Sequence, residues 1–123
     1  MEDLLSETEA LGDLLRDHRA ADVAVLDLRP LSTWTDFFVV ATAASDTHMD
    51  GLERHMKDFC RERGLEILRR SYRPKGTSEG GEWRIVDLGP IVVHLMSSRA
   101  RAFYDLERLY SGGTGNRATT VTA

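Results

Sequence analysis

Hydrophobic residues in this chain recur in blocks, and the spacing within three of these blocks predicts helices. Their apolar residues return at intervals of three, four and seven, which places them along one face of a helix. The three segments are residues 3–19, 46–63 and 98–110. In the last of them, we expect Phe103, Leu106 and Tyr110 to face the core.

Five other segments are short and rich in β-branched or aromatic residues, which is typical of β-strands. They are residues 22–27, 36–43, 67–72, 83–87 and 91–96. The second of these is an almost continuous apolar run, so we expect that strand to be buried on both faces. Such burial requires helices on both sides of the sheet.

The order of these elements, α-β-β-α-β-β-β-α, predicts an α/β fold. We expect a single-domain sandwich in which helices flank a mixed five-stranded β-sheet. A chain of 123 residues is the size of one ordinary domain, and we assign residues 1–111 to it. Residues 112–123 are small and polar, so we expect them to form a flexible C-terminal tail.

Charge is distributed unevenly along the sequence. Residues 1–53 carry 12 acidic and 3 basic side chains, whereas residues 54–75 carry 3 acidic and 8 basic ones, in a chain of net charge −4. The acidic first part argues against a molecule that binds nucleic acid with its whole surface, since phosphate neutralisation needs basic groups. The basic segment is either a solvated helix face and loop or a local contact for RNA. Its last basic residues are Arg69, Arg70, Arg73 and Lys75.

The sequence favours a cytoplasmic location. No apolar run approaches the roughly 20 residues that span a bilayer. The first residues are acidic, unlike those of a secretory signal or an Arg-rich transit peptide. The single cysteine, Cys60, excludes a disulfide within the chain and a cysteine-based zinc site, and we expect it to be a small buried hydrophobe.

The usual sequence signatures of catalysis are absent. The four histidines have no recognised ligand spacing, and no serine lies in a G-x-S-x-G turn, so we expect no metal and no cofactor. Asp27, Asp36 and Asp87 fall at strand ends, where three acids could hold a divalent cation for nucleotidyl transfer. They lack the closely spaced Asp-x-Asp pair, however, and the alternative is that each accepts local hydrogen bonds.

Large side chains with polar tips gather in the last third of the sequence. They are Trp83, His94, Arg101, Tyr104 and Tyr110. Tryptophan, tyrosine and arginine are the residues most enriched in binding hot spots. The group is therefore either an interaction surface or a set of half-buried core residues.

Several motifs together resemble the ribosomal silencing factor family, also called Iojap-like proteins. The resemblance extends over residues 4–111 and rests on Val25-Leu26-Asp27, Asp36-Phe37-Phe38-Val39-Val40-Ala41-Thr42, Trp83-Arg84-Ile85-Val86-Asp87-Leu88-Gly89, Val92-Val93-His94 and Arg101-Ala102-Phe103-Tyr104-Asp105-Leu106-Glu107-Arg108-Leu109-Tyr110. The combination of Trp-x3-Asp-x-Gly, Val-His and Arg-x-Phe-Tyr-x-Leu-Glu at these distances is specific, although no single motif is.

The resemblance implies a function without catalysis. It implies a nucleotidyltransferase-like topology without the catalytic acids, a homodimer when free, and binding to large-subunit ribosomal protein L-fourteen. That binding would block the joining of the ribosomal subunits and repress translation when nutrients are limiting. The residues that the resemblance places at or beside the ribosomal surface are Trp83, Asp87, His94, Arg101 and Tyr104.

The chain departs from the family pattern at three positions. Pro90 stands where an aspartate usually follows the glycine, Ala43 replaces a glycine, and Tyr110 replaces a tryptophan. Two other classes of function remain open at this point. One is a metal-dependent nucleotidyltransferase, and the other is a dimerising adaptor that does not associate with ribosomes.

Overall fold

The computed structural model describes residues 4–31, 34–71, 82–103 and 119–122. It confirms the predicted α/β class and the order of the elements. These are α1 (Leu4–Asp17), β1 (Ala21–Asp27), the short 3-10 helix η1 (Arg29–Leu31), β2 (Phe37–Thr42), α2 (Asp46–Arg63), β3 (Arg69–Ser71), β4 (Trp83–Asp87), β5 (Ile91–Met96), α3 (Ser98–Phe103) and β6 (Thr119–Thr122). None of the helices in the described ranges has the length and apolar character that crossing a membrane requires.

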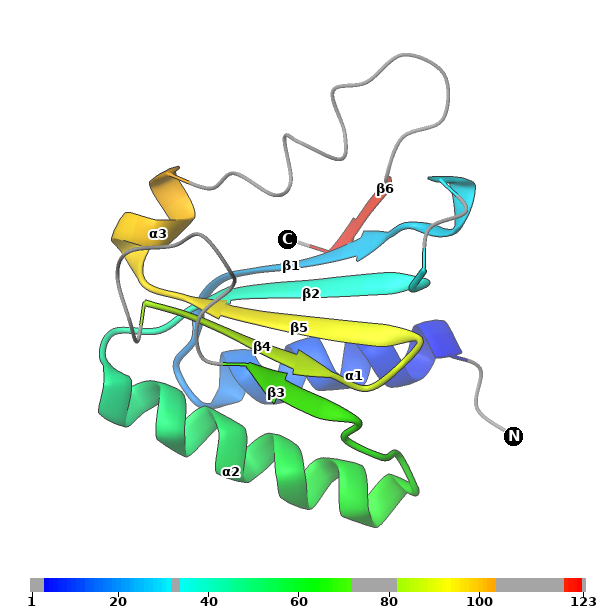
Figure 1. The fold of residues 1–123 in the computed structure, drawn as a ribbon, viewed down its shortest axis with the longest axis horizontal. Helices are drawn as coiled ribbons and strands as arrows, with labels where there is room; N and C mark the ends of the chain where they lie inside the picture. The colour runs from blue at the N-terminus through cyan, green and yellow to red at the C-terminus, as the bar shows by residue number, and fades with distance from the viewer. Residues whose placement is uncertain (1–3, 32–33, 72–81, 104–118, 123) are drawn as a thin grey trace.

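The strands form one mixed sheet in the order β3-β4-β5-β2-β1-β6 (Figure 1). β2 and β5 are parallel, and the other neighbouring pairs are antiparallel. The two parallel strands lie at the centre of the sheet. Every residue of both is buried, as the apolar runs in the sequence predict.

The sheet has one strand more than the five expected. β6 lies within the segment 112–123, for which we expected a flexible tail, and it pairs antiparallel with β1 through Leu26↔Thr120 and Asp27↔Thr119. Thr119-Thr120-Val121-Thr122 is wholly β-branched, and the edge of β1 offers unpaired backbone groups. Pairing with that edge therefore orders a segment that is too short to show a periodicity of its own.

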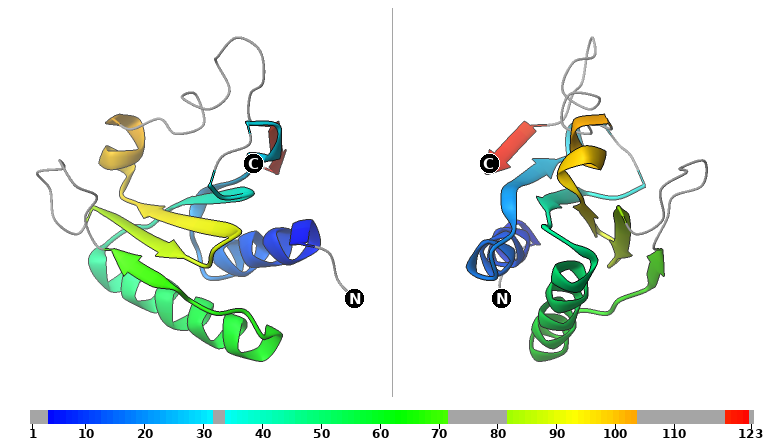
Figure 2. Two further views of the ribbon diagram at one scale, coloured as in Figure 1. Left: turned by 45° about the vertical axis from the view of Figure 1, so that its right-hand side comes forward. Right: turned by 90° about the vertical axis from the view of Figure 1, so that its left-hand side faces the viewer.

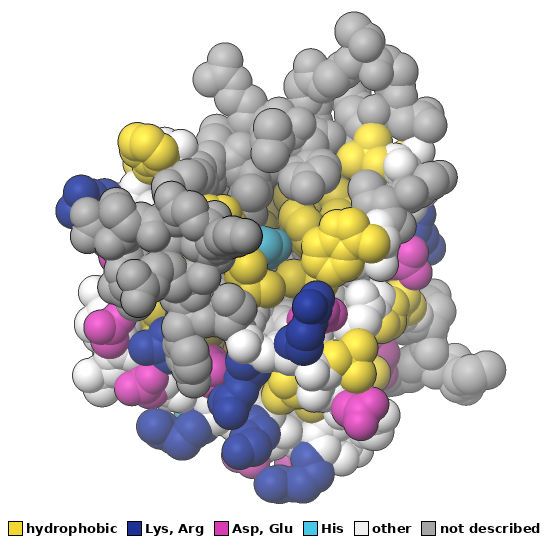
Figure 3. All heavy atoms as spheres, in the orientation of Figure 1, with side chains coloured by type: hydrophobic (Ala, Val, Ile, Leu, Met, Phe, Trp, Pro, Cys, Tyr) yellow, Lys and Arg dark blue, Asp and Glu magenta, His cyan; other side chains and the backbone are white. Residues whose placement is uncertain are grey.

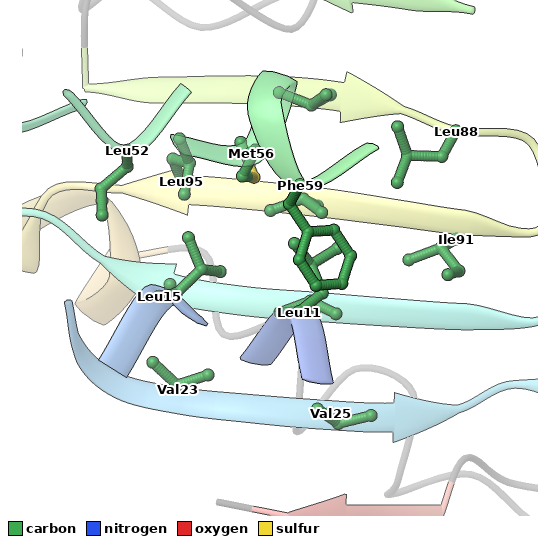
Figure 4. Packing of buried hydrophobic residues seen from close by; sticks show 14 of the residues in the cluster. Leu11, Leu15, Val23, Val25, Leu52, Met56, Phe59, Leu88, Ile91 and Leu95 are labelled. Atoms are coloured by element: carbon green, nitrogen blue, oxygen red, sulfur yellow. The ribbon is translucent and has the colours of Figure 1, made fainter. Parts of the chain in front are cut away.

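Two helices cover one face of the sheet. α1 and α2 lie side by side on it, and the main hydrophobic core fills the space between helices and strands (Figures 1 and 2). Figure 4 shows this packing, with side chains from both helices directed at the central strands. Labelled there are Leu11, Leu15, Val23, Val25, Leu52, Met56, Phe59, Leu88, Ile91 and Leu95.

We expected helices on both sides of the sheet, but the face opposite α1 and α2 has much less helical cover in the described ranges. Among the described residues, α3 is the only α-helix on it, near the end of β5, where Ala100 is buried, and Leu31 of η1 packs against the same face. A smaller apolar cluster occupies this face, and it includes Phe38, Trp83 and Val92. Large side chains from the strands themselves therefore bury one another on this side.

The last predicted helix differs in one further respect. We expected Phe103 to face the core, but its side chain is 77% exposed, because α3 lies at the end of the sheet and buries only Ala100. Leu106, Tyr110 and most of the predicted segment 98–110 lie outside the described residues.

The ends of α2 show the local signals that the sequence contains. Ser45 caps the first turn by accepting a hydrogen bond from the backbone N–H of His48 at 3.0 Å. Gly64 ends the helix in the left-handed region with φ 72°, and its N–H donates to the carbonyl of Cys60. Burial raises the pKa of the Cys60 thiol, which agrees with the structural role predicted for it.

Candidate partner-binding site

The centre of the candidate site is a hydrogen-bonded pair on the sheet face opposite α1 and α2. The indole Nε1–H of Trp83 on β4 donates to Nδ1 of His94 on β5 at 3.1 Å. The two strands are antiparallel neighbours, with Ile85 opposite His94 and Trp83 opposite Met96, so the two side chains lie diagonally on one face. The structure thus brings together two of the predicted site residues.

The imidazole of His94 is held neutral. The ring is buried, and burial lowers its pKa from 6.5 to about 4. Since Nδ1 accepts the hydrogen bond from Trp83, the proton of the neutral ring is on Nε2. That Nε2–H is buried and has no hydrogen-bond partner among the residues that the structure describes. It is a hydrogen-bond donor whose direction the neighbouring indole determines.

Aromatic rings extend this surface toward the loop before β2. The ring of Phe38 meets His94 edge to face, with centroids 4.5 Å apart, and Trp34 meets Phe38 edge-on at 6.3 Å. The Trp34 side chain is 67% exposed. Figure 3 shows this face, with a histidine in cyan among hydrophobic side chains in yellow. We call Trp34, Phe38, Trp83 and His94 the aromatic patch.

Trp34 was missed by the sequence analysis. It lies between two of the predicted strands, in a segment to which no element and no role was assigned. The available signal was a large aromatic residue in a polar setting, since Thr33 precedes it and Thr35 follows it. Thr35 fixes the loop by donating its hydroxyl to the carbonyl of Gly89 at 2.9 Å.

Arg101 lies at the same end of the sheet as Trp83. Its Nη1 donates to the Thr42 hydroxyl at 2.9 Å, and Thr42 is opposite Met96, which in turn is opposite Trp83. The guanidinium thus joins α3 to the end of β2, beside the aromatic patch. Tyr104, another of the predicted site residues, lies outside the described residues.

Asp87 lies at the other end of β4 and has structural bonds of its own. Its Oδ1 accepts the backbone N–H of Gly89 at 2.8 Å, which closes the turn into β5. Its Oδ2 accepts from the Arg69 guanidinium, with Nη2 at 3.1 Å. The structure therefore separates Asp87 from the Trp83–His94 pair.

The three strand-end acids lie at the same end of the sheet, but β2 and β5 separate Asp27 from Asp87, and two of the three have arginine partners. Asp27 binds Arg29 through both oxygens, at 2.7 and 2.9 Å, and this hydrogen bonding lowers the pKa of the Asp27 carboxyl. Asp87 binds Arg69 as described above. Within the described ranges, no group of three His, Cys, Asp or Glu side chains is arranged to hold a metal ion. Local hydrogen bonding, one of the two interpretations drawn from the sequence, describes Asp27 and Asp87.

The other three histidines are His18, just after α1, and His48 and His55 in α2, and they line one common pocket. His48 accepts the N–H of Ala44 at Nδ1, at 2.9 Å, and donates from Nε2 to the carbonyl of His18, at 2.8 Å. The rings of His18 and His55 are stacked with centroids 3.5 Å apart. These contacts tie the two helices together and leave both nitrogens of His48 occupied.

Comparison with known proteins gives a consistent result. The sequence model of the family described as "Ribosomal silencing factor during starvation" matches residues 2–122. A ribosomal silencing factor of Treponema pallidum is 44% identical over 101 residues, which is 82% of this chain and 86% of that protein. A mouse protein named "Mitochondrial assembly of ribosomal large subunit protein 1" is 28% identical over 105 residues, 85% of this chain and 45% of the mouse protein.

A solved structure shares the fold. The crystal structure of a Chromobacterium violaceum protein superposes with a TM-score of 0.75 at 25% identity, covering 99% of this chain and 95% of the other. The family match extends over nearly the whole sequence, and the Treponema relative is similar over most of its own length. The chain belongs to the ribosomal silencing factor family.

Proposed function

We propose that this protein is a ribosomal silencing factor that binds the large ribosomal subunit through ribosomal protein L-fourteen. By occupying the intersubunit face it blocks association with the small subunit and represses translation under nutrient limitation. Membership of the family supports this proposal, as does the name of the mouse relative, which refers to the ribosomal large subunit.

The aromatic patch is the observation that carries the proposal. Steric blocking requires a surface that holds a partner and needs no catalytic group. Trp34 is 67% exposed and packs on Phe38, which contacts the buried Trp83–His94 pair, so an exposed indole has a rigid aromatic base, a combination suited to a protein hot spot. We therefore propose Trp34 as the exposed contact residue, with Trp83 and His94 as partner-binding residues that support this surface from beneath.

The remaining site residues enter the proposal with different roles. Arg101 on α3 extends the surface, Tyr104 is a further contact residue, and Asp87 contributes by holding the turn between β4 and β5. We further propose a cytoplasmic protein that is a homodimer when free, acts without catalysis and needs no cofactor. Arg69 and Arg70 on β3 offer local contact with ribosomal RNA, together with Arg73 and Lys75.

Sedimentation with purified ribosomal subunits tests the proposal. The protein should travel with the large subunit and not with the isolated small subunit, and added protein should reduce the joining of the two. Equal binding to both subunits would reduce the effect to charge attraction, and absence of binding to either would favour the dimerising adaptor. Saturable binding of a nucleotide with magnesium would instead support the nucleotidyltransferase.

A further inference from the structure

A charged pocket lies on the other side of the sheet from the aromatic patch. It has a volume of about 240 Å³ and is lined by Asp50, Glu53, Arg54, Lys57 and Arg70. These residues come from α2 and β3, which neighbour each other at the bottom of Figure 1. Figure 3 shows Lys and Arg side chains gathered in the same part of the molecule. Every lining residue is charged, so the pocket is unsuited to an apolar ligand.

Both acids of the pocket form ion pairs with arginine side chains. Arg84 on β4 is buried, at 7% exposure, and its Nη1 binds Asp50 Oδ1 at 2.6 Å and Glu53 Oε2 at 2.7 Å. Arg70 Nη1 lies 3.5 Å from the other oxygen of Glu53. Arg84 Nη2 also lies 3.9 Å from Asp46 Oδ1, so three carboxylates and two guanidiniums form this network and its formal charge is −1.

Arg54 and Lys57 remain as uncompensated positive charges. Both are exposed, and within the described ranges neither forms a hydrogen bond or an ion pair. They are three residues apart on α2 and therefore emerge on the same side of the helix. Among the described residues, the pocket thus presents two unpaired cations, Arg54 and Lys57, beside an ion-pair network whose formal charge is −1.

We propose that this pocket binds a phosphodiester group of RNA, which gives the protein a second contact on the ribosome. The inference rests on the proposed function for its biological setting. A phosphate has the charge and the acceptor oxygens that Arg54 and Lys57 lack in the free protein. The small, wholly charged lining favours a nucleic-acid backbone over a protein partner, whose hot spots need aromatic or apolar pockets.

The two contacts are geometrically independent. Trp83 and Arg84 are successive residues of β4, so their side chains point to opposite faces of the sheet. Trp83 enters the aromatic patch, and Arg84 reaches the base of the charged pocket. A protein on one side and an RNA strand on the other can therefore be held at the same time.

Fluorescence anisotropy with a labelled RNA hairpin tests the pocket directly. Arg54→Glu and Lys57→Glu should each weaken RNA binding about tenfold and lower the slope of log affinity against log salt by about one. Arg61→Glu is the matched control, because Arg61 lies one turn further along α2, outside the pocket, in an exposed ion pair with Asp58. Because Arg61 does not line the pocket, Arg61→Glu should weaken RNA binding clearly less than either pocket variant does.

Three results would overturn the inference. The first is an equal loss of RNA affinity in Arg61→Glu and Lys57→Glu, and the second is unchanged RNA affinity in the pocket variants. The third is displacement of the RNA by oligoglutamate as strong as that by inorganic phosphate, which would indicate an acidic protein as the partner. Displacement by inorganic phosphate at high concentration supports a phosphate site. Arg54→Gln replaces Arg54→Glu if thermal melting shows that charge reversal unfolds the chain. Sedimentation of the same variants with the large subunit distinguishes this inference from the proposed function. A variant that loses RNA binding but still sediments with the large subunit would leave the docking role of the aromatic patch intact.

Discussion

The N–H of Trp83 determines which nitrogen of His94 carries the proton. With the indole donating to Nδ1 at 3.1 Å, the neutral imidazole has its hydrogen on Nε2, among the side chains of the aromatic patch. The pair therefore works as one unit, in which a change at the indole alters the chemistry that the histidine can offer.

The first prediction concerns that unit. In Trp83→Phe the ring remains but the donor is lost, so Nδ1 of the buried His94 has no partner from β4. We expect the free energy of unfolding to fall by about 1–3 kcal/mol in urea denaturation. Nitrogen-15 NMR of the imidazole should show the Nε2–H form in the wild type and a mixture of tautomers in the variant. A single unchanged tautomer would show that the indole does not control the ring.

The second prediction is a pH dependence of stability. The pKa of folded His94 is about 4, whereas an unfolded histidine titrates near 6.5. Between these values the unfolded chain binds a proton that the folded chain does not, so stability falls as the pH is lowered through this window. The loss should approach about 3 kcal/mol at pH 4, and there should be none from this group above pH 6.5.

His94→Asn isolates this contribution from that of the other histidines. The Asn side-chain oxygen can still accept the Trp83 N–H but does not titrate. Between pH 4 and 6.5, the free energy of unfolding of His94→Asn should then change less steeply with pH than that of the wild type, and the difference in slope should correspond to one bound proton. Equal slopes in the two proteins would mean that His94 titrates normally in the fold.

The third prediction separates binding from folding. Trp34 is 67% exposed, so Trp34→Ala should change the free energy of unfolding by less than about 0.5 kcal/mol. If the aromatic patch is the docking surface, the same change should weaken large-subunit binding by about 2 kcal/mol or more. Leu68→Ala is the control, because Leu68 is exposed but is not part of the patch. Normal subunit binding by Trp34→Ala would remove Trp34 from the surface.

The fourth prediction addresses the buried arginine. Arg84→Met leaves the buried Glu53 without its closest partner and should cost about 3 kcal/mol of stability. Adding Glu53→Leu should recover much of the loss, since an apolar pair can replace a buried ion pair. If the double variant is as unstable as the single one, Arg84 acts through packing and not through its charge.

Local signals account for most of the fold that the sequence predicts. Ser45 and Gly64 delimit α2, and the apolar runs of β2 and β5 identify the buried centre of the sheet. Such features depend on neighbouring residues alone. β6 is different, because its four residues are ordered by the edge of β1, more than 90 positions earlier in the chain.

The site was predicted only in part for the same reason. Trp83 and His94 were chosen for their residue types, but their hydrogen bond follows from the register of β4 and β5. The partners of Arg84 on α2 are 31 and 34 residues away, so no local pattern shows that this strand buries a charge. Asp87 was assigned to the binding surface, and only the turn geometry reveals its bond to Gly89.

The pairing of β6 with β1 has a practical consequence for handling the protein. A variant cut after residue 118 would uncover the backbone donors and acceptors of β1 that pair with β6, at Val25, Leu26 and Asp27. An exposed edge of this kind recruits extended segments from other molecules, including further copies of the same chain. Purification tags are therefore better fused to the N-terminus, and a shortened protein that forms dimers or aggregates would report on its new edge and not on the native assembly.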